Sequence, residues 1–252
     1  MSDQKLRDHI AVVTGAGQGI GAAVARRFAA EGAQVGVVDV DNERATVVAS
    51  EIAESGGSAL AVVCDVSRRD EVRRAASQVE NAFGSISILV NNAGITRPAM
   101  LWNMTDEDWD AVLATHVYGS WYWLQEVVQS MREASAGRII FSSSSAGLTG
   151  AIGQINYAVA KAGLLGMMRA ASLELARHNI TVNAVAPAAS TPMTRRIRED
   201  PKFRDRYLKE IPLNRWAEAE EVAGTYAFLA SDDAAYMTGQ VLSIDGGRTM
   251  VR

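Results

Sequence analysis

The chain has 252 residues, 48% hydrophobic and 21% charged, which is enough to bury a large core. The formal net charge is −4 and there is no long basic block, which argues against a nucleic-acid surface or an electrostatic membrane anchor. No apolar run reaches the roughly 20 residues of a membrane-spanning helix, and the polar N-terminus lacks the apolar region of a signal peptide. Cys64 is the only cysteine, which excludes an intramolecular disulfide and fits the reducing cytosol. We expect a cytoplasmic protein with one domain, residues 1–252.

Short apolar, β-rich runs alternate with longer helical patterns along the chain. Strands are predicted at 9–15, 33–40, 58–66, 86–94, 137–145, 180–187 and 239–247, and helices at 20–31, 42–54, 69–83, 105–133, 157–177 and 218–229. This rhythm predicts an α/β fold, a doubly wound parallel sheet of seven strands with helices on both faces. The least regular part is 190–216, where prolines interrupt a charged stretch, and we predict a mobile substrate lid there.

The first predicted strand ends in the glycine-rich turn "TGAGQGIG". Its spacing is T-G-x-x-x-G-x-G, because Ile20 occupies the last glycine position of G-x-G-x-x-G. Small residues let the backbone approach a pyrophosphate, and the following helix presents free N–H groups to it. A tight strand-to-helix turn without a ligand is the alternative. The cofactor-binding residues predicted here are Gly15, Gln18, Gly19, Ile20 and Gly21.

Asp39 ends the second predicted strand, 18 residues after Gly21. An acidic side chain at this place can accept hydrogen bonds from the adenine-ribose diol. It also repels a 2′-phosphate, and its neighbours Gln18 and Val40 supply no arginine to neutralise one. The sequence therefore favours NAD over NADP, although a capping role is an alternative for an aspartate here and suits Asp41.

Tyr157 and Lys161 are four residues apart in "NYAVAKAG" and so share one helical face. Ser144 precedes Tyr157 by 13 residues and ends a predicted strand, at the sheet edge where open α/β sheets bind ligands. An isolated Tyr-x-x-x-Lys is more often a surface pair. Here it accompanies "TGAGQGIG", "NNAG" and "IDGG", and with these motifs the chain resembles the classical branch of the short-chain dehydrogenase/reductase (SDR) family over nearly its whole length. The nearest-looking group is the 3-oxoacyl reductase type.

The resemblance implies a Rossmann-type single domain and a catalytic Ser144, Tyr157 and Lys161. Tyr157 would be the acid/base, Lys161 would lower the pKa of Tyr157 and hold the nicotinamide ribose, and Ser144 would bind the substrate oxygen. The implied activity is hydride transfer between NAD(H) and a small-molecule secondary alcohol or ketone. Reduction of a 3-oxoacyl thioester on an acyl carrier protein or coenzyme A is the alternative, and an NAD-binding sensor or scaffold is the non-enzymatic one. No metal is expected.

Further cofactor contacts follow from the resemblance alone. They are Asp65, Val66, Asn91, Ala93, Gly94, Pro187 and Thr191, together with Tyr157 and Lys161. Asp65 and Val66 would contact adenine, and Asn91 would lie by the adenosine ribose. The loop after Pro187 departs from the family, because Ala188 replaces the usual glycine and Thr191 follows by 4 positions rather than 5. The loop's contacts with the cofactor are therefore open.

His116 stands where the family usually has a catalytic asparagine. In the family the helix opens slightly here, and a main-chain carbonyl holds a water that relays protons from the lysine. His116 is either a packed helix residue or a member of that relay, since histidine titrates near neutrality. The sequence leaves both open.

Two surface features bear on partners. The aromatic run 121–123 cannot all face one core, and the resemblance implies a homotetramer built on this helix. Segment 191–215 carries an excess of four positive charges, which either attracts an anionic substrate or forms a solvated face. Leu148, Ala151 and Ile152 are expected to line an apolar pocket.

Overall fold

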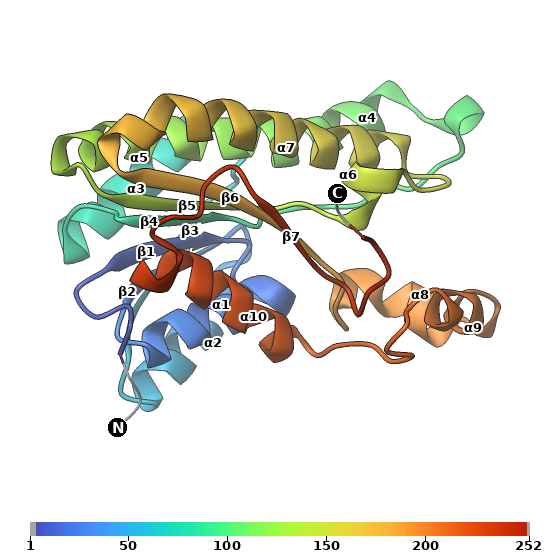
Figure 1. Cartoon of the computed structure of the whole chain (residues 1–252), viewed down its shortest axis with the longest axis horizontal. Helices are drawn as coiled ribbons and strands as arrows, with labels where there is room; N and C mark the ends of the chain where they lie inside the picture. Colours follow the sequence, from blue (N-terminus) through green and yellow to red (C-terminus); the bar gives the residue numbers. More distant parts are fainter. Residues whose placement is uncertain (1–3, 251–252) are drawn as a thin grey trace.

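The computed structural model describes residues 4–250, which form one parallel sheet between two layers of helices (Figure 1). The strands lie in the order β3-β2-β1-β4-β5-β6-β7, and every neighbouring pair is parallel. Their bounds are β1 Ile10–Thr14, β2 Gln34–Asp39, β3 Ser58–Val63, β4 Ile88–Asn91, β5 Gly137–Ser142, β6 Ile180–Pro187 and β7 Val241–Ile244. The predicted seven-stranded doubly wound fold is confirmed.

Helices cover both faces of the sheet, and each face has its own apolar core. The longer helices are α1 Gly19–Ala30, α2 Asn42–Glu54, α3 Arg69–Phe83, α4 Asp106–Leu113, α5 Gly119–Ala134, α7 Ile155–Leu175 and α10 Ala219–Ala230. The apolar sides of α1, α2 and α10 pack on one face of the sheet, and those of α3, α5 and α7 pack on the other (Figure 1).

The strands are apolar on both faces because both faces are covered. In β1, Ala11 and Val13 belong to the core under α1, whereas Val12 between them belongs to the core under α3 and α5. All three side chains are fully buried. Consecutive strand residues point to opposite faces, so one short apolar run supplies both cores.

The strand order reverses between β1 and β4, which are direct neighbours in the sheet. Crossover connections leave β1 toward β2 and β4 toward β5, so the loops at the carboxyl ends of β1 and β4 diverge and leave a crevice. Open α/β sheets bind ligands at such a switch point. The fold therefore places the glycine-rich turn after β1 opposite the "NNAG" segment after β4.

The predicted helix 105–133 is interrupted. Between α4 and α5 the backbone forms a π-helical turn, η2 Ala114–Tyr118, which contains His116. The segment 190–216 is also not a plain loop, since it holds η4 Pro192–Thr194, α8 Arg195–Glu199 and α9 Pro201–Lys209. A short helix, α6 Ser145–Thr149, precedes α7. Remaining single turns are η1 Leu101–Asn103, η3 Ala176–His178 and η5 Asp232–Ala234.

Within residues 4–250, no helix combines the length and apolarity needed to cross a membrane. In the same range, no three histidine, cysteine or acidic side chains come together as a metal site.

Candidate active site

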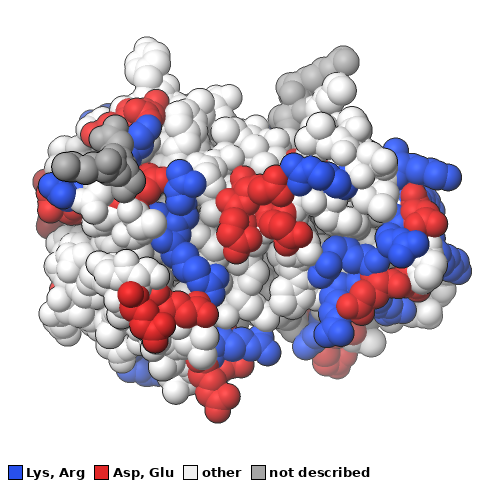
Figure 2. Space-filling view, turned by 90° about the horizontal axis from the view of Figure 1, so that it is seen from below, with Lys and Arg blue, Asp and Glu red and all other residues white. Residues whose placement is uncertain are grey.

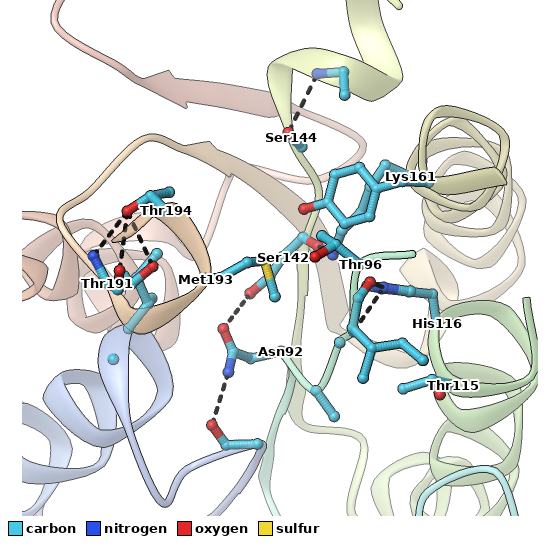
Figure 3. A pocket seen from close by; sticks show the side chains of 18 of the residues that line it. Asn92, Thr96, Thr115, His116, Ser142, Ser144, Lys161, Thr191, Met193 and Thr194 are labelled. Carbon is cyan, nitrogen blue, oxygen red and sulfur yellow. Dashed lines mark hydrogen bonds between the residues drawn. The ribbon is translucent and has the colours of Figure 1, made fainter. Parts of the chain in front are cut away.

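A cavity of about 970 Å³ runs along the carboxyl edge of the sheet (Figure 3). At one end it is lined by Asp39 and Asp65, which follow β2 and β3, and at the other by Tyr207 and Arg248. Ser144, Tyr157 and Lys161 line it between these ends. The cavity therefore spans the switch point and is large enough for an extended cofactor and a small substrate.

The glycine-rich turn brings backbone to the cavity wall with no side chain in between. Gly15 has φ +63°, and a Cβ there would lie 2.7 Å from the Cα of Ala93. A Cβ on Gly21 would lie 2.2 Å from the carbonyl oxygen of Gly15. Larger residues would push the turn away from β4, so both glycines are needed for this close approach. The turn leads into the N-terminus of α1 and fits a pyrophosphate.

Thr14 and Asn92 tie the turn to β4. The Thr14 hydroxyl accepts hydrogen bonds from the backbone N–H groups of Asn92 and Ala93 at 2.9 and 3.0 Å. The Asn92 amide in turn donates to the carbonyl oxygens of Thr14 and Gly15 at 2.9 and 3.2 Å. Asn92 lines the large cavity, whereas the predicted residue Asn91 does not. Asn91 ends β4 and is buried beside Trp123, because neighbouring residues on a strand point to opposite faces.

Asp39 is fixed at the tip of β2. One carboxylate oxygen accepts a hydrogen bond from the N–H of Gly17 at 2.8 Å, and the other accepts one from Asp41 at 3.0 Å. The carboxylate therefore sits beside the glycine-rich turn with oxygens held toward the cavity. Arg44, one turn into α2, also lines the cavity, and its Nε lies 3.1 Å from the Asp41 carboxylate. This arginine was not predictable from the residues beside Asp39, because it reaches the cavity from α2.

The loop after β6 closes over the glycine-rich turn. The backbone of Ala188 donates to Ile244 of β7 at 2.9 Å, and Ser190 donates to Ala217 at 2.8 Å. Thr191 then starts η4 in a capping box with Thr194 (Figure 3). A Cβ on Gly19 would lie 3.4 Å from Thr191, so Thr191 contacts the turn despite the shortened spacing.

The four consecutive serines have different partners. The Ser142 hydroxyl lies 2.8 Å from the phenol of Tyr226, and the Ser143 hydroxyl donates to the carbonyl of Lys161 at 3.1 Å. Both are buried, as strand-end residues that tie β5 to its covering helices. All of these serines line the cavity, and Ser144 also caps α6 by accepting from the N–H of Ala146 at 3.2 Å (Figure 3).

Tyr157 and Lys161 project from the first turns of α7 into the cavity. The Lys161 ammonium nitrogen is 5.5 Å from the centre of the Tyr157 ring and donates to the Ser142 carbonyl at 2.6 Å. Lys161 is 4% exposed, so its charge acts on the phenol with little screening by solvent.

Burial shifts both pKa values toward the neutral forms. It lowers the pKa of Lys161 to about 7 and raises that of Tyr157 to about 12, while the nearby Ser144 opposes the shift at Tyr157. A phenol with this pKa stays protonated at neutral pH and is a weak acid. Proton removal from Tyr157 therefore needs positive charge nearby, which a protonated Lys161 supplies.

His116 is buried in the π-helical turn and contacts Tyr157. Its ring meets that of Tyr157 edge-on at 5.3 Å, and its Nε2 lies 2.9 Å from the carbonyl oxygen and 3.1 Å from the N–H of Ile95 (Figure 3). A Cβ on Gly94 would lie 2.2 Å from the ring. Burial, together with the charge of Lys161, lowers the pKa of His116 to about 3. An imidazole with this pKa is neutral near pH 7, which favours a packed helix residue over a relay member that titrates near neutrality.

The cavity collects most of the residues predicted from the sequence. Those that line it are Gly15, Gln18, Gly19, Ile20, Asp39, Asp65, Val66, Ala93, Gly94, His116, Ser144, Tyr157, Lys161, Pro187 and Thr191. Gly21 supports the turn from behind, and Leu148 packs on the core, whereas Ala151 and Ile152 line the cavity. The lining residues that sequence reasoning missed include Arg44, Asn92, Tyr207 and Arg248.

Comparison with known proteins gives the class. A family model described as "Enoyl-(Acyl carrier protein) reductase" matches residues 15–249. Two solved structures cover almost the whole chain. One is a levodione reductase (TM-score 0.92, 34% identity, 96% of this chain and 98% of that one), and the other is a putative short-chain alcohol dehydrogenase from Sinorhizobium meliloti (TM-score 0.94, 33% identity, 98% of both). The chain belongs to the classical short-chain dehydrogenase/reductase family.

Two curated relatives place it more narrowly. The 3-oxoacyl-[acyl-carrier-protein] reductase of Thermotoga maritima is 43% identical over 244 residues, which cover 96% of this chain and 98% of the relative. The 3-oxoacyl-[acyl-carrier-protein] reductase of a Synechocystis species is 43% identical over 248 residues, covering 97% and 98%. The chain is an oxidoreductase close to the 3-oxoacyl reductase group, as the motifs indicated.

Proposed function

We propose that this protein reduces the ketone of a 3-oxoacyl thioester to the secondary alcohol, with Tyr157 as proton donor. The observation that carries the proposal is the convergence of Ser144, Tyr157 and Lys161 on one cavity beside the glycine-rich turn. A bound nicotinamide cofactor would supply the hydride. The relatives' names favour 3-oxoacyl thioesters over the simple ketones and secondary alcohols that the sequence analysis put first.

Each catalytic side chain has a separate task in this proposal. Ser144 binds the substrate oxygen, and Tyr157 gives its proton to that oxygen as negative charge develops on it. Lys161 is positioned by the Ser142 carbonyl and favours the phenolate that remains. His116 fixes the Ile95 backbone and borders Tyr157, and a role in relaying protons to Lys161 stays a proposal.

We further propose that NAD(H) is preferred over NADP(H). The fixed Asp39 carboxylate can accept hydrogen bonds from a ribose diol and repels a 2′-phosphate. Arg44 is the group that works against this preference, but its side chain is paired with Asp41.

A dehydrogenase of secondary alcohols or cyclic ketones is the second candidate. It is favoured by Asp39, because NAD(H) suits oxidation as well as reduction, and by the likeness to a levodione reductase. Both candidates use the same residues, and a cytoplasmic homotetramer is proposed for either.

The test is a substrate panel followed by reduced-nicotinamide absorbance. It contains 3-oxoacyl thioesters, simple ketones, cyclic diketones and secondary alcohols, each with NAD(H) and with NADP(H). The proposal expects the highest kcat/KM for a 3-oxoacyl thioester with NADH. Binding of NADH without turnover of any compound would favour a sensor or scaffold.

A further inference from the structure

Two arginines from distant parts of the chain line the substrate half of the cavity. Arg196 lies on α8, and Arg248 follows β7. The acidic side chains that line the cavity are Asp39, Asp41 and Asp65, all of which follow β2 or β3. Since β2 and β3 lie on the opposite side of β1 and β4 from β6 and β7, the carboxylates belong to the adenosine half. Within the described residues, the substrate half is lined by cationic groups and by no acidic one.

Arg248 is held by an aromatic ring and a carboxylate. Its guanidinium carbon lies 3.9 Å from the centre of the Tyr207 ring, and the other face of that ring stacks on Trp216 with centroids 4.5 Å apart and planes at 9°. Two of the three guanidinium nitrogens, Nε and Nη2, donate to Glu210 at 3.2 and 2.7 Å. Arginine has five N–H donors, so donors remain for a ligand. The stack joins the lid helix α9 to the segment after β7.

Glu210 pairs with Arg248 but does not line the cavity, and its second carboxylate oxygen is 3.6 Å from the Nε of Arg206. One carboxylate is thus shared by two guanidinium groups, while Arg196 on α8 lines the same cavity as Arg248. Figure 2 shows Lys and Arg gathered on the side of the molecule where Figure 1 places α8 and α9.

Arg248 and Tyr207 line the same cavity as Tyr157. Burial raises the pKa of Tyr157, and Tyr207 adds to this shift. The two phenols therefore face the same chamber. A substrate whose carbonyl meets Tyr157 would extend past Tyr207 toward Arg248.

We propose that Arg248 selects carbonyl substrates that carry an anionic oxygen group. The guanidinium fork matches the oxygens of carboxylates and phosphates, and its stacking on Tyr207 reduces the entropy lost on binding. The inference rests on the proposed carbonyl reduction and specifies its substrate class. Two sources share this chemistry, the carboxylate of a free oxo acid and the phosphates of a coenzyme A thioester.

Matched substrate pairs separate the two sources. One pair is 4-oxopentanoate and its methyl ester, and the other is 3-oxobutanoyl-coenzyme A and the phosphate-free 3-oxobutanoyl-N-acetylcysteamine. Arg248→Gln should lower kcat/KM about 10- to 100-fold for the anionic member of one pair, mainly through KM, while both neutral members change less than about threefold. The pair whose anionic member loses kcat/KM shows whether Arg248 binds the carboxylate of an oxo acid or the phosphates of coenzyme A. Arg204→Gln is the control, because Arg204 is on α9, the helix that carries Tyr207, pairs with Asp205 and does not line the cavity.

A binding measurement makes the test independent of turnover. Calorimetry with the NADH complex of Tyr157→Phe should show tighter binding of an anionic probe than of its neutral partner, and adding Arg248→Gln should remove the difference. If Arg248→Gln weakened the binding of anionic and neutral compounds equally, Arg248 would only shape the lid and the inference would be wrong. If the protein with native Arg248 bound neither anion more tightly than its neutral partner, the inference would also be overturned. If no carbonyl compound is reduced but Arg248-dependent anion binding persists, the proposed function fails and this inference stands.

Discussion

Tyr157 is the side chain on which the proposed chemistry depends. Its phenol lies in the cavity between Ser144 and Lys161, and replacement by phenylalanine removes one hydroxyl while keeping the ring against His116. We predict that Tyr157→Phe lowers kcat about 100- to 10,000-fold, the range for loss of a general acid. The affinity for NADH, measured by fluorescence titration, should change less than about threefold, since the ring remains. Retention of a tenth of the activity would exclude Tyr157 as the acid.

The lowered pKa of Lys161 can be tested through the pH dependence of the free energy of unfolding. Burial lowers its pKa from 10.5 to about 7 in the folded protein, so between these values the unfolded chain binds the extra proton. Stability rises with pH wherever the unfolded state binds more protons. The free energy of unfolding should therefore rise above pH 7 in the unaltered protein and rise less in Lys161→Met. Urea titrations without cofactor, kept below pH 10 where unfolded tyrosine ionises, measure this. If the free energy of unfolding depended on pH in the same way in both proteins, the lowered pKa of Lys161 would be contradicted.

Variants of His116 test whether its side chain or only the backbone of this turn takes part in a proton relay. Because its pKa is about 3, its protonation cannot bend a pH–rate profile near neutrality. We predict that His116→Asn, which can still hydrogen-bond Ile95, keeps activity within about tenfold and has the same acidic limb as the unaltered protein. His116→Ala should lose more, because it frees Ile95, but far less than Tyr157→Phe. If the pH–rate profile of the unaltered protein had an acidic limb near neutral pH and that of His116→Asn did not, the imidazole would be the titrating group.

Several site residues were predictable because their chemistry is local. The glycines after β1, Asp39 at a strand end and the Tyr157–Lys161 pair each carry their signal within a few residues. Arg248 and Tyr207 were not predictable, since they meet only when α9 packs against the segment after β7. Asn92 was not predicted, because Asn91 and Asn92 are adjacent in the sequence. Choosing between them requires knowing to which face of the sheet the last residue of β4 points.

At the scale of elements, the strands were predicted well and the helix after β4 was not. Buried parallel strands are short apolar runs bounded by glycine and polar residues, and all seven appear as such in the sequence. The π-helical turn of Ala114–Tyr118, which packs against α7, has no such signal in its own residues, and only the resemblance to the family indicated that the helix opens at His116. The prediction that the aromatic run 121–123 cannot all face one core is confirmed, because Trp123 is fully buried and Trp121 is 41% exposed.

The helices α8 and α9 form the proposed lid. Their trypsin sites include Arg195, Arg198 and Arg204, and none of the lid residues from Arg195 to Lys209 is fully buried. We predict that limited trypsin digestion cuts first within 195–209 and that NADH with a substrate analogue slows this cleavage at least severalfold, since closure orders the lid. Mass spectrometry of the first fragments checks the site. Unchanged cleavage with ligands present would show that the segment is not a closing lid.

At the scale of the molecule, the proposed homotetramer needs a self-association face, and we propose that it is formed by exposed apolar side chains on η2, α5 and α7. Tyr118, Trp121 and Val159 are each more than a third exposed, and they lie on the neighbouring elements η2, α5 and α7. Such side chains are enriched at interface cores. We predict a tetramer in light scattering and smaller species for Trp121→Glu, with Trp102→Glu on η1 as the control. A monomeric unaltered protein would contradict the proposed assembly.

The central claim is a direct hydride transfer assisted by Tyr157, and deuterium reports it most directly. The protein is incubated with 3-oxobutanoyl-coenzyme A and NADH deuterated at the transferable position, and the product is analysed by mass spectrometry and NMR. The account predicts one deuterium on the carbinol carbon of the 3-hydroxy product for each NADH oxidised, and almost none with Tyr157→Phe although that variant still binds NADH. Oxidation of NADH without deuterium in the product, or equal transfer by Tyr157→Phe, would contradict it.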